Sequence, residues 1–340
     1  MRVFGSLKIA ICNVMWFADK SDICHSTKRI FSMRIKDVHA GIIFLISMIL
    51  AANPLLAQDE GGNGFKFPYD LNNPERKYYL PDILMEVSGN ALLNERIMIC
   101  IQDEEGDLFF YDLDEGRLLK RVDFGKDADY EDVVLVEDEV FVLRSNGTIY
   151  RLREFENEKT VRTKEIKTRL SKKNNCEGLC YDPVENRMLI ALKGDPEVDD
   201  DQDFDGYKAI YSFGLYDEKV SKKPAYLIDL SKIKDLENAS LYEKISHRIA
   251  ETFEESGDIR FQPSAIAIHP ITDHIYILAS VGKAIVVMDR TGEMIHVEKL
   301  DKWQFVQPEG MTFWPDGTLY ISSEGDGGNG KLMRFEMEKR

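Results

Sequence analysis

The sequence is poor in cysteine, and this shortage excludes a disulfide scaffold. After residue 57 only Cys100, Cys176 and Cys180 remain. Three cysteines are an odd number, so they cannot all pair within the chain and supply a complete disulfide framework. Cys176 and Cys180 could pair with each other, but their spacing fits neither a zinc ribbon nor a redox motif. Cys100 lies in an apolar run and is expected to be buried as a small hydrophobic side chain.

Basic residues are also scarce. The chain has 44 Lys and Arg against 60 Asp and Glu, a net charge of −16. The first 57 residues hold seven of the basic and three of the acidic groups, which leaves 37 basic and 57 acidic groups and a net charge of −20 for the remainder. Such a surface repels nucleic acid and anionic membranes and attracts cations. We therefore expect no nucleic-acid partner.

Motifs of common enzyme classes are missing. The sequence has no nucleophile elbow, no phosphate-cradling glycine loop and no zincin helix. The histidines after residue 57 are few, and His269 and His274 flank a predicted hairpin turn, which favours a structural role. The pattern suggests no Ser–His–Asp arrangement, although such triads are spatial and a sequence does not exclude them.

The N-terminal region has the features of an export signal. Arg34 and Lys36 precede an apolar run at 41–50, which is followed by small residues and then by polar sequence from Gln58. This order predicts a secretory signal cleaved after Ala57, with a retained anchor as the alternative, although the run is short for a membrane span. Met33 begins a signal of normal length, so residues 1–32 are interpreted as an upstream extension whose translation stays open. We expect a periplasmic, cell-surface or secreted protein without a stable membrane span, and we favour a monomer.

An internal repeat predicts the fold. A short motif recurs with the residues Ser88, Glu131, Glu177, Ser264 and Glu309 at one equivalent position, at steps of 43, 46, 87 and 45 residues. A period of about 45 residues suits a four-stranded propeller blade. The sequence therefore predicts an all-β protein, a β-propeller of five blades over residues 76–340, preceded by a flexible segment at 58–75.

Two details complete the predicted architecture. The long step contains apolar residues mostly four apart within 235–256, which predicts a helical insertion, with a sixth blade as the alternative. The last motif supplies only three strands, and the segment 76–80 could complete that blade and close the ring.

Three glutamates at the repeated position are the first candidate site. Each lies at the start of a predicted innermost strand, so Glu131, Glu177 and Glu309 are expected to face one shared space. Clustered carboxylates raise each other's pKa unless a cation relieves them, and Ca²⁺ accepts oxygen ligands in flexible geometry. Alternatively, each glutamate caps backbone N–H groups of a neighbouring blade or is simply solvated.

A second ring is expected where the next strand of each blade ends. It comprises Asp103, Arg144, Lys193, Ser280 and Glu324. Arg144 and Lys193 could neutralise the carboxylates by salt bridges, or they could hold an anionic group such as phosphate.

An acidic loop is the second candidate metal site. Asp201, Asp203 and Asp205 alternate before Gly206, which matches the first half of a calcium loop of the EF-hand type. Position twelve is Ser212 instead of a bidentate glutamate, so the loop is incomplete. The candidate metal ligands are thus Asp201, Asp203 and Asp205 together with Glu177 and Glu309. The alternative is a solvated acidic loop.

Several short segments resemble the SdiA-regulated family of bacterial β-propeller proteins. They are 80–89, 175–179, 308–311 and 319–324. The resemblance implies an extracytoplasmic propeller with a calcium-associated role and no settled enzyme activity, and it extends to the esterase-like phytase group. Asn90, where an apolar residue is usual, and the helix at 235–256 depart from the family pattern.

Three functions are consistent with these features. The first is an extracytoplasmic calcium-binding propeller with a binding, signalling or stress-response role. The second is a metal-dependent phosphoester hydrolase that uses Glu177 and Lys193 at the mouth of the central channel. The third is a protein-interaction platform built on the inserted helix.

Overall fold

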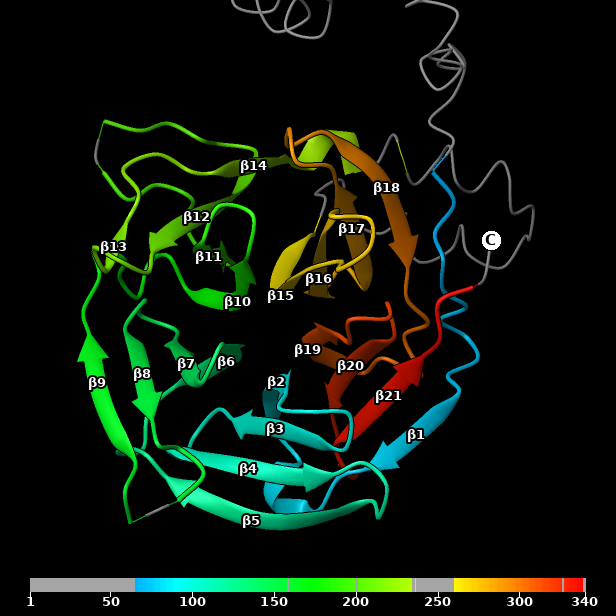
Figure 1. Cartoon of the computed structure of the whole chain (residues 1–340). Coiled ribbons are helices and arrows are strands. Elements are labelled where there is room, and N and C mark those ends of the chain that lie inside the picture. Colours follow the sequence, from blue (N-terminus) through cyan, green and yellow to red (C-terminus); the bar gives the residue numbers. More distant parts are fainter. Residues whose placement is uncertain are drawn as a thin grey trace, which may run out of the picture. The chain divides into compact units, whose positions relative to one another are not determined.

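The computed structural model describes residues 65–157, 159–199, 201–233, 236, 260–325 and 327–338. The chain divides into two units, residues 1–63 and 64–340, and all described residues belong to the second. Five antiparallel sheets of this unit surround a common axis (Figure 1), with β2, β6, β10, β15 and β19 innermost. The prediction of an all-β, five-bladed propeller is confirmed. Among the described residues, no helix is long and apolar enough to cross a membrane.

Each of the first two blades is a four-stranded meander. Blade 1 comprises β2 (Val87–Leu92), β3 (Ile97–Gln102), β4 (Asp107–Asp112) and β5 (Arg117–Asp123). Blade 2 comprises β6 (Tyr130–Val136), β7 (Glu139–Arg144), β8 (Ile149–Arg153) and β9 (Arg162–Ile166). The predicted turn at Asn146 and Gly147 connects β7 and β8, and Gly147 adopts a φ of 80° there.

Blade 3 differs in its outer strand, which is divided into two short pieces. It comprises β10 (Cys176–Asp182), β11 (Arg187–Leu192), β12 (Tyr207–Gly214), β13 (Lys219–Val220) and β14 (Tyr226–Asp229). Both β13 and β14 pair with β12. Blade 4 is regular, with β15 (Gln262–Ile268), β16 (Ile275–Val281), β17 (Ala284–Met288) and β18 (Met294–Lys299).

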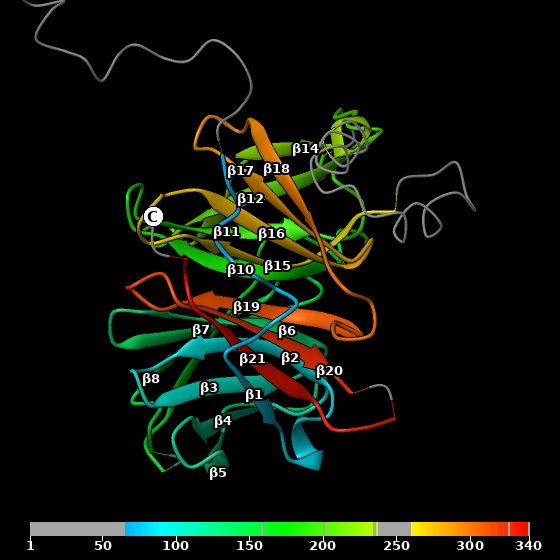
Figure 2. The ribbon, with the colours of Figure 1, turned by 90° about the vertical axis from the view of Figure 1, so that its right-hand side faces the viewer.

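Blade 5 closes the ring by joining the two ends of the domain. Its inner strands are β19 (Gln307–Phe313), β20 (Leu319–Glu324) and β21 (Lys331–Phe335), and β1 (Arg76–Tyr79) pairs with β21 as the fourth strand. The views of Figures 1 and 2 agree that β1 lies beside β21. This closure was predicted from the strand count. Because β1 pairs with one edge of β21 and β20 with the other, β21 has no open edge. A single 3-10 turn, η3 (Asp82–Leu84), leads from β1 to blade 1.

The core lies between the blades. The described residues form five hydrophobic clusters, and each cluster joins two neighbouring blades. Tyr78 and Leu332 of blade 5, for example, pack with Met98 and Phe109 of blade 1. Most residues of the inner three strands are buried because both faces of each sheet contact another blade. Burial of apolar surface is the main stabilising contribution to such a fold, and here it depends on ring closure.

The segment before β1 is packed where a flexible segment was predicted. In its described part, Phe67, Tyr69 and Leu71 are buried in the cluster between blades 4 and 5. The Tyr69 hydroxyl donates a hydrogen bond of 2.6 Å to the Gly317 carbonyl and lies 2.8 Å from His269 Nε2. The alternating aromatic residues of this segment bury enough apolar surface to outweigh the entropy of ordering it.

Other predictions about the fold have mixed outcomes. Residues 230–233 are helical, but the insertion predicted at 235–256 lies outside the described residues except for Leu236, as do the signal at 33–57 and the extension at 1–32. Cys176 and Cys180 are free and buried, so the pairing considered for them does not form. Cys100 is buried as expected, and burial raises the pKa of its thiol to about 12.

Candidate functional site

The repeated sequence motif encodes a β-bulge at the same place in every inner strand. In each blade the pairing of the first two strands skips one residue of the inner strand, and these residues are Ser88, Glu131, Glu177, Ser264 and Glu309. In blade 4 the pairing also skips Ser280 of the second strand. A bulge leaves the extra residue unpaired and re-aims its side chain. The position that the sequence singled out as a ring is therefore a ring of bulges around one end of the axis.

Small residues after the bulges let neighbouring inner strands come close. A Cβ atom on Gly178 would lie 2.8 Å from the Ile266 backbone nitrogen, and one on Gly89 would lie 2.7 Å from Asp132 Cα. Asp132 has the position equivalent to these glycines, and its Oδ2 accepts a 2.7 Å hydrogen bond from the Leu179 amide of the next blade. An isolated glycine inside a strand signals a bulge or a close approach, so this feature was readable in the sequence.

The bulges bring the predicted glutamates together. Burial raises the pKa of Glu131, and the nearby charges of Glu177 and Asp129 raise it further. Burial raises the pKa of Glu309 to about 7, with Glu177 as the next contribution. Glu177 and Glu309 expose only 4% and 9% of their surface. Glu131, Glu177 and Glu309 are therefore near enough for their charges to act on one another.

The second predicted ring adds two more carboxylates. Burial raises the pKa of Glu324 to about 7, with further contributions from Glu309 and Asp103. Burial also raises the pKa of Asp103 to about 6, and the charge of Glu86 contributes. These two carboxylates and the three glutamates at the bulges form one acidic cluster, the carboxylate basin, which comprises Glu131, Glu177, Glu309, Glu324 and Asp103.

Lys193 neutralises part of this basin. Its Nζ lies 3.0 Å from Glu177 Oε1, which also accepts a 2.7 Å hydrogen bond from Asn175 Nδ2. Burial by itself lowers the pKa of Lys193, but the surrounding glutamates outweigh burial and the pKa is raised. Lys283 lies near Glu309 and Glu324, and its Nζ donates to the carbonyls of Ser280 and Val306. The acidic groups still outnumber these two cations.

Arg144 does not occupy the place predicted for it. The strand register pairs Arg144 with Tyr130 and Leu192 with Cys176, so Arg144 corresponds to Leu192, one step before Lys193. The residue equivalent to Lys193 is Ser145, whose hydroxyl donates to Asp129. The two ring positions lie 14 residues apart in blade 2 and 15 or 16 apart in the other blades, so sequence spacing alone did not identify Ser145 as the equivalent residue. Arg144 Nε is buried without a hydrogen-bond partner.

The acidic loop is organised by other side chains than its aspartates. Gln202 Oε1 accepts hydrogen bonds from the amides of Val198 and Asp199, and Glu197 Oε1 accepts one from the Phe204 amide. Asp201, Asp203 and Asp205 are exposed. Across the described part of the chain, no three Asp, Glu, His or Cys side chains are placed together so that they could hold a metal ion.

A cavity lies on the propeller axis beyond the ring of bulges. It has a volume of about 300 Å³ and is lined by all five inner strands, from two residues past each bulge onward. Most of its lining is apolar, and the polar exceptions are Asn90 and Thr312 together with the hydroxyl-bearing Tyr181.

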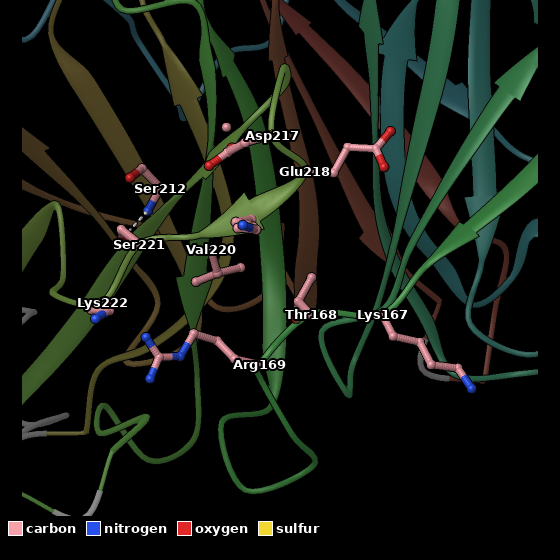
Figure 3. A pocket seen from close by; sticks show the side chains of 11 residues that line it. Lys167, Thr168, Arg169, Ser212, Asp217, Glu218, Val220, Ser221 and Lys222 are labelled. Atoms are coloured by element: carbon pink, nitrogen blue, oxygen red, sulfur yellow. Dashed lines mark hydrogen bonds between the residues drawn. The ribbon is translucent and has the colours of Figure 1, made fainter.

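A wider hollow of about 650 Å³ lies on the outer side of blades 2 and 3 (Figure 3). Lys167, Arg169 and Lys222 line it, but Arg169 pairs with Asp199, and Glu218 accepts hydrogen bonds from Lys164. None of the predicted ring residues lines this hollow.

Comparison with protein families gives one match. The model of the SdiA-regulated family matches residues 220–326. This part of the propeller is similar to the SdiA-regulated family. The matched part holds β14 of blade 3, all of blade 4 and the two inner strands of blade 5, β19 and β20. It therefore includes Glu309 and Glu324 but not the motif at 175–179. No curated protein matches this chain.

Several solved structures are similar to this chain at low sequence identity. Glutaminyl cyclase of Myxococcus xanthus is 10% identical, over 78% of this chain and 96% of that chain, with a TM-score of 0.47. The PQQ-bound aldose sugar dehydrogenase of Streptomyces coelicolor is 10% identical over 78% and 98%, with a TM-score of 0.46. Virginiamycin B lyase of Staphylococcus aureus is 13% identical over 78% and 74%, with a TM-score of 0.39. These likenesses say nothing about activity.

Proposed function

We propose that this propeller is an extracytoplasmic binding protein whose carboxylate basin takes a cation, with Ca²⁺ as the candidate ion. The observation that carries the proposal is the raised pKa of four partly or fully buried carboxylates, three of them at bulges and the fourth, Glu324, at the end of β20. A raised pKa means that ionising these groups at neutral pH costs free energy, about 1.4 kcal/mol for each pKa unit. A bound cation would offset that cost.

The donor chemistry of the basin suits Ca²⁺. This ion takes six to eight oxygen ligands in flexible geometry, and waters complete its coordination where protein oxygens are few. Glu131, Glu177, Glu309 and Glu324 supply carboxylate oxygens. Because no three described acidic side chains already converge as ligands, binding would require Glu177 to exchange Lys193 for the ion. The loop at Asp201–Asp205 fits less well, because its aspartates are exposed and do not converge.

Export is the second element of the proposal. It is supported by the predicted signal at 33–57 and by the acidic composition of the remainder. The N-terminal sequence of protein purified from the outside of expressing cells checks it directly. A first residue of Gln58 is expected, whereas protein that keeps residues 41–50 would favour the retained anchor.

Phosphoester hydrolysis is a second candidate, because Lys193 and Lys283 stand among the carboxylates and could face a substrate phosphate. Acidic groups outnumber these cations, which favours cation binding over anion binding in the basin. Turnover of phosphomonoesters by wild type that is lost in Lys193→Met would support hydrolysis instead. The interaction platform depends on 235–256 and stays a prediction.

Thermal unfolding of chelator-treated protein tests cation binding. A ligand that binds only the folded state at 100 times its Kd stabilises it by about 2.7 kcal/mol. Millimolar Ca²⁺ is therefore expected to raise the Tm of wild type and of Asp203→Asn, but not that of Glu177→Gln or Glu309→Gln. An unchanged wild-type Tm would refute the proposal. If Ca²⁺ raises the Tm of Glu177→Gln but not that of Asp203→Asn, the ion binds at the acidic loop and not in the basin.

A further inference from the structure

The segment before β1 packs on the histidines of blade 4. Residues 65–71 of this segment are called the strap below. The structure describes three histidines, and all of them contact the strap: His269, His274 and His296. The Phe65 ring lies 5.4 Å from the rings of His274 and His296, measured between centroids. The Phe67 ring stacks on His296 at 5.3 Å, and the Tyr69 ring lies 6.2 Å from His269. Each aromatic side chain of the strap therefore packs against a histidine.

The strap is attached mainly through its side chains. It belongs to no sheet, and within the described ranges a single main-chain hydrogen bond joins it to the rest of the propeller, from the Glu338 amide to the Pro68 carbonyl at 2.9 Å. The ion pair of Lys66 with Glu338 is exposed, and exposed pairs of this kind contribute little to stability. A segment held in this way can detach as a unit while the sheets beside it stay intact.

The contact between Tyr69 and His269 requires a neutral imidazole. His269 Nδ1 accepts hydrogen bonds of 3.1 Å from the amides of Ile271 and Thr272, so this nitrogen carries no proton. The proton is therefore on Nε2, which donates to the Tyr69 hydroxyl at 2.8 Å, and that hydroxyl donates to the Gly317 carbonyl. A second proton on Nδ1 would point at two amide donors, so the charged ring cannot keep this arrangement.

A charge on His269 would be poorly compensated in its buried position. The titratable groups around it, contributed by the strap, by β16 and by the two adjoining turns, are Tyr69, His274, Tyr276, Asp273 and Asp316. Asp273 already pairs with Arg290, and the Asp316 carboxylate accepts a hydrogen bond from the Thr318 amide. Burial, with a smaller contribution from His274, lowers the pKa of His269 to about 4. Once the strap has left, water reaches the ring and the pKa returns toward its ordinary value of 6.5.

We propose that the strap is an acid-released element: protonation of His269 expels it from its place between blades 4 and 5, while the five blades stay folded. A docked strap and a charged His269 exclude each other, so the equilibrium between the docked and the released strap shifts with proton concentration. His296 has no such role, because its Nε2 lies 3.0 Å from Glu298 Oε2 and a charge on that ring has a carboxylate partner. The device is separate from the carboxylate basin and does not depend on the proposed cation.

Cysteine labelling of the full chain, read peptide by peptide by mass spectrometry, tests the release. Leu71→Cys places a thiol on a buried position of the strap, and the exposed position next to it provides the matched control, Asn72→Cys. Dithiodipyridine is the probe, because it reacts with thiols at acid as well as at neutral pH. The ratio of the buried to the exposed labelling rate is expected to rise about twentyfold from pH 7 to pH 5, since the pKa of His269 is about 4 with the strap docked and 6.5 with it released. Three native cysteines that are buried in blades 1 and 3 should stay unlabelled, which shows that the blades are folded: Cys100, Cys176 and Cys180.

Two histidine variants identify the group that titrates. His269→Asn keeps an acceptor for the turn amides, as Asp182 does at the corresponding turn of blade 3, but it has no imidazole, so its labelling ratio should be nearly equal at pH 7 and pH 5. His296→Gln is the control and should keep the twentyfold rise. The proposal is overturned if the ratio does not rise with His269 intact, if the native cysteines of the blades are labelled together with the Leu71→Cys thiol, if His269→Asn keeps the rise, or if His296→Gln abolishes it. Comparing the two pH values with His269 intact decides the matter even where His269→Asn does not fold.

Discussion

Lys193 Nζ lies 3.0 Å from Glu177 Oε1, and Glu177 belongs to β10 whereas Lys193 directly follows the paired strand β11 of the same blade. Glu177 is the bulged residue, so its side chain turns toward the axis, and Lys193 follows the end of β11 at the same level. The charges of Glu131 and Glu309, from two other blades, act on the same lysine. A single cation therefore connects carboxylates that three blades contribute.

The pH dependence of stability should report the basin. Glu309 and Glu324 have pKa values of about 7 in the folded protein, above the ordinary value of 4.5. The folded state therefore binds their protons more tightly than the unfolded state does, and the stabilisation that this gives is lost as pH rises through about 7. In calcium-free buffer the Tm should rise as pH falls from 8 to 6.5.

The buried His269 sets the lower limit of the pH range in this experiment. Below pH 6.5 the effect of His269 opposes the trend, because burial lowers its pKa to about 4 and protonation then favours unfolding. The double variant Glu309→Gln, Glu324→Gln should show a flatter profile between pH 8 and 6.5. A wild-type Tm that stays constant or falls over that interval would show that these carboxylates do not have raised pKa values.

Removal of the basin lysine should destabilise the protein in a pH-dependent way. Lys193→Met leaves Glu177 without its cation, and we expect a loss of about 2 kcal/mol at pH 8, since breaking a partly buried ion pair leaves an uncompensated charge. The loss should be smaller at pH 6, where Glu177 is more protonated. Urea unfolding at both pH values measures this, with exposed Lys172→Met as the control. Equal losses at the two pH values would contradict the argument.

The same lysine variant also bears on the cation. If Ca²⁺ displaces Lys193 from Glu177, the ion binds more tightly where the lysine is missing. Ca²⁺ should therefore raise the Tm of Lys193→Met by more than it raises the Tm of wild type. A smaller rise would mean that Lys193 assists binding instead of competing with the ion.

The close approach of neighbouring inner strands should make one glycine intolerant of a side chain. A Cβ atom on Gly178 meets the backbone of Ala265 and Ile266, which cannot rotate away. Gly178→Ala is expected to cost about 1–3 kcal/mol, as overpacking of a core does. Gly328→Ala is the control, because nothing lies within 4 Å of the added atom there. Equal denaturation midpoints for the two variants would disprove the tight contact.

The segment before β1 should contribute to stability through Tyr69. Its hydroxyl bonds both His269 and Gly317, and only 5% of the residue is exposed. Tyr69→Phe should destabilise the domain by about 1–2 kcal/mol, whereas Tyr79→Phe, at a residue that is 65% exposed, should have almost no effect. Chemical denaturation of the two variants provides the comparison. A neutral Tyr69→Phe would indicate that the segment is only loosely attached.

Short-range sequence patterns were sufficient to predict the five repeats and the ring position that holds the three glutamates. The position of Glu131, Glu177 and Glu309 could be found because equivalent residues recur at nearly constant steps and inner strands of a propeller converge on one axis. Arg144 was misassigned because the separation of the two ring positions varies from 14 to 16 residues among the blades, and a shift of one residue reverses the side of a strand. The calcium loop was suggested by spacing alone, which does not show whether side chains converge.

The amino-acid sequence by itself determined five repeated sheets and the acidic residues at their inner edges, because both follow from short-range periodicity. Only the tertiary structure decided that Lys193 lies among glutamates of other blades, and that Asn90 lines a cavity whose other lining residues are mostly apolar. These relationships join residues that are far apart in the chain. They depend on closure of the ring, which fixes distances that no local pattern specifies.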